Sequence, residues 1–152
     1  MRRSAGVTLL EMLVVVSIIA AMAGVAYIPL TAGLDSLRLS SSATTCAAFF
    51  TSALTRAERT QEVVEIAIFE KEGTLRMRST APGFERKAEL GKGVKINAVL
   101  PALEQQEDGP RLFYLYPGGS VPRIGIELAN ARQRRVLVRV DPITGVPKVE
   151  KQ

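Results

Sequence analysis

A single carboxylate, that of Glu11, lies near the start of a run that is otherwise uncharged and almost wholly apolar as far as Leu34. A charged side chain at mid-bilayer depth costs roughly 2.5–3.5 kcal/mol, so a lone carboxylate in such a run indicates a function. The chemistry open to it is ion pairing with a cation at similar depth. Two charges that are unfavourable alone in lipid would offset each other as a pair. The alternative is a side chain that snorkels to the membrane surface.

A second group of charged residues, all basic, lies near the C-terminus. Residues 35–110 carry ten Lys/Arg and eleven Asp/Glu, whereas residues 111–152 carry eight and three, so this region holds most of the formal net charge of +5. Such a group could bind DNA phosphates. It could equally be a solvated face or contact other subunits. The residues concerned are Arg132, Arg134, Arg135, Arg139 and Lys148.

Most catalytic and metal chemistry lacks its side chains in this sequence. There is no histidine and only one cysteine, Cys46, which is expected to be a small core residue. No G-x-S-x-G stretch is present, so no nucleophile–base pair is predicted. The acidic stretch 104–108 could hold calcium, but a solvated loop is the preferred interpretation. We therefore expect no enzyme activity, no cofactor and no metal.

The element that carries Glu11 is the apolar run itself. As a helix, residues 12–34 would extend about 34 Å, enough to cross a hydrocarbon core of roughly 30 Å. Arg2 and Arg3 precede the run, which predicts a cytoplasmic N-terminus and an exported C-terminal part. A cleaved secretory signal, with its small-residue site at 21–23, is the competing interpretation. A buried helix of a soluble protein is excluded by the length of the run and its lack of a polar face.

The exported part begins with a helix and continues as strands. Residues 35–61 are expected to continue the first helix, because apolar residues recur there at helical spacing while Ser and Thr fill the other side. The period then changes to two, which predicts strands. The expected strands are 64–68 and 75–78, which form a hairpin, and 94–100, 111–116, 123–128, 135–140 and 146–149, with 80–92 and 101–110 as loops. Short, evenly spaced strands indicate an antiparallel two-sheet sandwich, so the predicted fold class is α+β with a long N-terminal helix packed on the sandwich.

The N-terminal residues also carry a resemblance. A short basic leader ending in Gly6, followed by Val7-Thr8-Leu9-Leu10-Glu11 and a long apolar run, resembles the signal of type IV prepilins and type II secretion pseudopilins. Phe is usual at the first mature position, where this chain has Val7. The resemblance implies that a prepilin peptidase cuts after Gly6 and methylates the amine of Val7. It also implies that Glu11, the fifth mature residue, meets the amine of a neighbouring subunit, and we predict Glu11 and Thr8 as assembly residues.

The C-terminal half carries a less specific resemblance. The segments 113–119, 123–128 and 135–145 resemble the GspH/FimT-type minor pseudopilins and minor pilins. Together the two resemblances imply four parts, namely a leader (1–6), a transmembrane and assembly helix (7–34), its continuation on the globular domain (35–61) and a periplasmic β-sandwich (62–152). They imply a structural subunit of a type II secretion pseudopilus or type IV pilus in the bacterial inner membrane, with other pilins and the prepilin peptidase as partners. The alternative is a DNA-binding minor pilin that acts in natural transformation.

Overall fold

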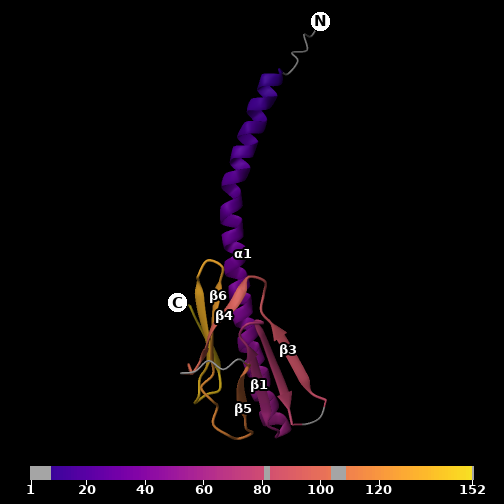
Figure 1. The fold of residues 1–152 in the computed structure, drawn as a ribbon, viewed down its shortest axis with the longest axis vertical. Coiled ribbons are helices and arrows are strands. Elements are labelled where there is room, and N and C mark those ends of the chain that lie inside the picture. The colour runs from indigo at the N-terminus through magenta and orange to yellow at the C-terminus, as the bar shows by residue number, and fades with distance from the viewer. Residues whose placement is uncertain (1–7, 81–82, 104–108, 152) are drawn as a thin grey trace. The chain divides into compact units, whose positions relative to one another are not determined.

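The computed structural model describes residues 8–80, 83–103 and 109–151, the side chains of residues 24–32 aside. Within this part the chain forms a helix, α1 (Leu9–Thr60), followed by strands (Figure 1). It divides into two compact units, residues 1–34 and 35–152. The strands are β1 (Val64–Phe69), β2 (Thr74–Ser79), β3 (Glu85–Glu89), β4 (Val94–Leu100), β5 (Arg111–Leu115), β6 (Gly125–Asn130), β7 (Arg135–Val140) and β8 (Pro147–Lys151).

The strands form two antiparallel sheets of four. One has the order β3-β2-β1-β5 and the other β4-β6-β7-β8. Alternation along the strands explains the layering, because Val64, Ile66 and Ile68 of β1 are buried and alternate residues of β7 are exposed and buried. The predicted α+β class, with a helix packed on antiparallel sheets, is therefore confirmed.

The second half of α1 shares one hydrophobic core with both sheets. Small side chains on the buried face of the helix, such as Ala43 and Ala53, let the backbone approach the sheets closely. Phe49 and Phe50 add bulk, with their rings edge to face at a centroid distance of 6.4 Å. Cys46 is fully buried, as predicted for a small core residue, and burial raises the pKa of its thiol to about 12.

The helix face expected to be polar is not wholly solvated. Ser42 is buried, and its Oγ accepts a hydrogen bond of 3.0 Å from the backbone N–H of Gly91. The expectation that all the serines of this helix lie on the open side was therefore wrong. The reason is that a hydroxyl is small enough to enter the contact and polar enough to satisfy a backbone donor of the loop between β3 and β4.

The segment 80–92, predicted to be a loop, contains the strand β3, so this prediction was wrong. β3 pairs with β2 in register Met77 with Arg86, yet four of its five residues are exposed. It is an edge strand held by backbone hydrogen bonds, and charged side chains are common on such edges. Beside it, the guanidinium of Arg56 lies 3.4 Å from the centroid of the Phe84 ring. Because little of β3 is buried, no hydrophobic alternation marked it in the sequence.

β6 begins two residues later than predicted and extends two residues past its predicted end, to Asn130. The side chain of Asn130 is buried, and its Oδ1 accepts hydrogen bonds from the backbone N–H groups of Arg132 and Arg134, at 3.0 and 3.1 Å. An amide that satisfies two turn donors explains why the strand extends to this residue.

Over the described side chains, no helix is both long enough and apolar enough to cross a membrane. The membrane span predicted for residues 7–34 stays a prediction.

Candidate functional site

The first candidate site is the start of α1, where Thr8 and Glu11 lie. Thr8 immediately precedes the helix, and its Oγ1 accepts a hydrogen bond of 3.2 Å from the backbone N–H of Glu11. Its carbonyl accepts the first intrahelical bond, from the N–H of Met12, also at 3.2 Å. Thr8 is thus an N-cap, and Glu11 is the acidic residue of the first turn, where the helix dipole favours a negative charge. Gly6 and Val7, the predicted processing residues, lie outside the described residues.

The first turns of α1 expose apolar side chains on every side. Leu9 is 83% exposed, and other large residues between it and Met22 are also well exposed. A soluble domain would bury one stripe of such a helix and leave the opposite face polar. A helix that is apolar all round is buried instead, in lipid or among other helices. The apolar surface of residues 9–22 is therefore of the kind that packs against lipid or against other helices.

The second candidate site is the basic group near the C-terminus, and the structure does not bring its members into one cluster. Arg135 and Arg139 share the exposed face of β7, as their spacing predicts. Arg132 and Arg134 lie instead in the turn between β6 and β7. Lys148 is opposite Arg139 on the neighbouring strand β8.

Four of these five basic side chains form ion pairs with carboxylates. The Arg132 Nε lies 3.4 Å from Asp35, the Arg135 Nη1 lies 3.1 Å from Glu127, the Arg139 Nη2 lies 2.9 Å from Glu150, and the Lys148 Nζ lies 2.8 Å from Asp141. Each pair reduces the positive potential that a phosphate would meet. The sequence showed the bases but could not show these partners, which come from neighbouring strands, the β7–β8 turn and the helix.

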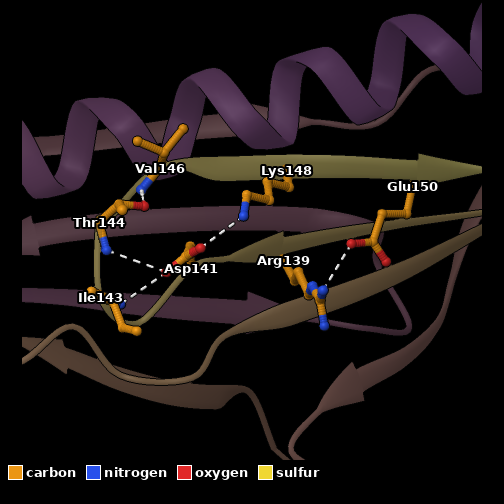
Figure 2. A network of polar contacts seen from close by, with 7 residues as sticks. All are labelled: Arg139, Asp141, Ile143, Thr144, Val146, Lys148 and Glu150. Atoms are coloured by element: carbon orange, nitrogen blue, oxygen red, sulfur yellow. Dashed lines mark hydrogen bonds and ion pairs between the residues drawn. The ribbon is translucent and has the colours of Figure 1, made fainter.

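The best-connected of these pairs is at the turn between β7 and β8, shown in Figure 2. One oxygen of Asp141 accepts from Lys148, and the other accepts from the N–H groups of Ile143 and Thr144, at 2.9 and 3.2 Å. The hydrogen bond from Lys148, followed by those two backbone donors, lowers the pKa of Asp141 from 3.8 to about 2. This network holds the turn between β7 and β8. The sequence signal that could have found it is the Asp-Pro-x-Thr-Gly pattern of an Asx turn.

Metal chemistry has no support among the described side chains, which include no cluster of three or more His, Cys, Asp or Glu residues. The acidic stretch 104–108, considered for calcium, lies outside the described residues.

Comparison with known proteins bears on the first site. Residues 1–27 match the prokaryotic N-terminal methylation motif. The match covers the Gly6–Val7 bond, Thr8 and Glu11, and it supports a type IV pilin-like prepilin signal. The motif suggests a pilin-type or pseudopilin substrate of a prepilin peptidase, and it is consistent with assembly with other pilins. No curated protein and no solved structure is matched by this chain.

Proposed function

We propose that the protein is a structural minor subunit of a type II secretion pseudopilus or a type IV pilus, of the GspH/FimT type. The observation that carries the proposal is the methylation motif over residues 1–27. The all-round apolar surface of residues 9–22 supports it, because such a surface can be covered by lipid before assembly and by other helices after it. In this proposal the apolar helix anchors the chain in the inner membrane, and residues 35–152 lie in the periplasm.

The capped helix start gives the proposed processing a physical consequence. Cleavage between Gly6 and Val7 would create an α-amine, whose pKa in model peptides is about 7.7–8.0, so it is a cation at neutral pH. This cation would lie one residue before Thr8, at the positive end of the helix dipole, where a positive charge is disfavoured. A carboxylate from a neighbouring subunit would offset this unfavourable interaction between the amine and the helix dipole.

Glu11 is the residue proposed to supply this carboxylate. In apolar surroundings neither the amine nor the carboxylate is stable alone, and together they offset each other only at one axial offset of two helices. The pair would therefore select the register of the filament even where its net contribution to affinity is small. The role is structural, and no catalytic step is assigned to the chain.

Mass spectrometry of the chain isolated from cells that contain a prepilin peptidase tests the processing step. The expected N-terminus is Val7 carrying one N-methyl group. An intact Met1, or an N-terminus at residue 24 after cleavage by an ordinary signal peptidase, would refute the proposal. A Gly6→Val chain is the matched control, since a bulky side chain at the cleaved bond should leave the leader attached.

The assembly step is tested by replacing Glu11. Glu11→Ala should be cleaved normally but incorporated poorly into filaments, measured by immunoblotting of the sheared filament fraction. Glu11→Gln keeps the size of the side chain and removes only its charge, so it should fail in the same way. Ser17→Ala, which removes a hydroxyl that donates to the carbonyl of Leu13 in its own helix, should assemble normally. Full incorporation of the Glu11→Ala chain would contradict the proposed role.

The DNA-binding alternative is the weaker proposal. Arg132, Arg135, Arg139 and Lys148 already contact carboxylates, so phosphate binding would have to compete with existing ion pairs. A gel-shift titration with short duplex DNA at low salt tests it. Binding at micromolar protein that falls steeply with salt would favour this alternative.

A further inference from the structure

Basic residues from three elements lie at the end of the 35–152 unit where its part of α1 begins. The last apolar residue of the run is Leu34, and Asp35 is the first charged residue after it. Four basic residues are placed around this end by three separate elements. We call them the basic collar: Arg38 of α1, Lys92 of the β3–β4 loop, and Arg132 and Arg134 of the β6–β7 turn.

Contacts with the first turns of this part of α1 fix the two other elements. The Arg132 Nε lies 3.4 Å from one oxygen of Asp35, and Arg38 approaches the other oxygen at 3.8 Å. On the loop that carries Lys92, the N–H of Gly91 donates to Ser42. A Cβ added at Gly91 would lie only 3.9 Å from that of Arg38, so this loop lies directly against the helix. The collar is therefore built into the fold and does not depend on long flexible segments.

The collar carries a net positive charge. Arg38 and Arg132 contact one carboxylate, Asp35, so the four bases and Asp35 sum to +3. The β1–β2 turn contributes Glu70, Lys71 and Glu72, or −1, and Glu89 at the end of β3 is paired with Lys87, which adds zero. That turn belongs to the same end, since the N–H of Leu90 donates to the carbonyl of Gly73. The sum of +2 is concentrated where the side chains are open to solvent, and the side chain of Arg38 is 51% exposed.

An apolar side chain accompanies these charges. Leu37, beside Arg38, is 68% exposed, although it lies in the part of α1 that belongs to the domain. Arg38 follows Leu34 by four residues, which is about 6 Å of helix. This rise is less than the Debye length of about 8 Å at physiological ionic strength. A basic ring with an exposed leucine, one turn beyond an apolar run, is the composition of a surface that rests on a membrane.

We propose that the basic collar binds the anionic headgroups of phospholipids in the membrane leaflet from which the domain emerges. The inference rests on the proposed membrane anchoring and adds a second, electrostatic contact to it. Arg and Lys have stems long enough to place their charged groups at the phosphate level while their methylenes lie against apolar surface. The occupant is taken to be lipid because its anionic headgroups complement the charge of the collar, and because Asp35, which Arg38 and Arg132 contact, directly follows the last apolar residue of the proposed anchor in the sequence.

The test uses the full chain reconstituted in vesicles of phosphatidylcholine, with or without phosphatidylglycerol. A donor dye on Ala131→Cys, in the exposed β6–β7 turn, reports energy transfer to an acceptor on the lipid headgroups. Cys46 is buried and does not compete for the label. Transfer should rise when the anionic lipid is present and return to the neutral-vesicle level at high salt.

Two pairs of substitutions separate the collar from net charge. Lys92→Gln with Arg134→Gln should lower the docking equilibrium about 25-fold, at about fivefold for each basic side chain near an anionic surface. Arg59→Gln with Arg123→Gln removes the same charge outside the collar and should leave the transfer unchanged. Equal transfer in neutral and anionic vesicles, or equal effects of the two pairs, would overturn the inference.

Two further measurements distinguish lipid binding by the collar from the proposed membrane anchoring and from DNA binding. Flotation of the chain with neutral vesicles reports anchoring alone, so a chain that floats but shows no lipid-dependent transfer refutes the collar and leaves the anchor standing. A chain that does not float refutes the proposed anchoring. Binding of duplex DNA that is lost with Lys92→Gln and Arg134→Gln, together with no response to anionic lipid, would identify a nucleic-acid site and overturn the inference.

Discussion

Replacing the N-cap residue of α1 tests whether the helix start depends on a single hydroxyl. In the structure the N–H of Glu11 donates to the Thr8 Oγ1 at 3.2 Å, and this bond holds the first turn closed. Removing an N-cap side chain costs about 0.5–2 kcal/mol, typically about 1 kcal/mol. Because local opening free energies set amide exchange, Thr8→Ala should raise the exchange rate of the Glu11 amide about fivefold, within a range of about 2- to 30-fold.

The assay is amide hydrogen exchange by NMR on the processed chain in detergent micelles. Thr8→Ser retains the hydroxyl and should restore protection. Thr44→Ala is the matched control, because the Thr44 Oγ1 donates only to the carbonyl of Ser40 in mid-helix. Unchanged exchange in Thr8→Ala, or a Thr8→Ser chain that behaves like the alanine variant, would refute the capping argument. Because the proposed mature N-terminus is one residue away, a frayed first turn should also weaken filament incorporation.

Three further outcomes follow from the core and the β7–β8 turn. Phe50→Ala should lower the free energy of unfolding by about 3–5 kcal/mol in denaturant titrations, whereas Thr51→Ala on the open face should change it by less than about 0.5 kcal/mol. The pKa of Asp141 in the folded protein lies below its value in the unfolded chain, so its contribution to the free energy of unfolding is complete above pH 3.8 and is lost as the pH falls through about 2. The NMR chemical shifts of the turn amides should follow this titration. In Asp141→Asn the same shifts should not depend on pH over this range. Cys46, with a pKa of about 12, should resist thiol reagents at pH 8 until the protein is unfolded, and fast labelling of the native chain would contradict its burial.

The strands that the sequence predicted well are those that bury alternate residues. β7 has the predicted bounds, Arg135–Val140, because three buried valines alternate with two exposed arginines and a leucine. The β1–β2 hairpin was also predicted, since its apolar residues have the same period and Gly73 adopts a positive φ in the turn. In each case the pattern that folds the segment is the pattern that is visible in the chain.

Features held by long-range polar contacts could not be predicted in this way. The strand β3 depends on backbone pairing with β2, and Ser42 is buried because Gly91 reaches it from 49 residues away. The ion pair between Asp35 and Arg132 joins residues 97 positions apart. Nothing local to these residues encodes their partners. The basic group was therefore visible in the sequence, while the carboxylates that neutralise most of it were not.

The helix α1 meets two packing requirements with different sequence patterns. Residues 9–22 are apolar on all sides, and this pattern requires a uniform environment such as lipid or a bundle of like helices. From Leu39 to Ala57 one face is buried with both sheets, so this half of α1 is part of the domain core and cannot be removed without exposing the inner faces of the sheets. Asp35 lies where one pattern gives way to the other, and its bonds to Arg38 and Arg132 tie the first turn of the domain helix to the β6–β7 turn. The change of pattern, more than any single residue, separates the residues of α1 that serve the proposed filament from those that belong to the domain core.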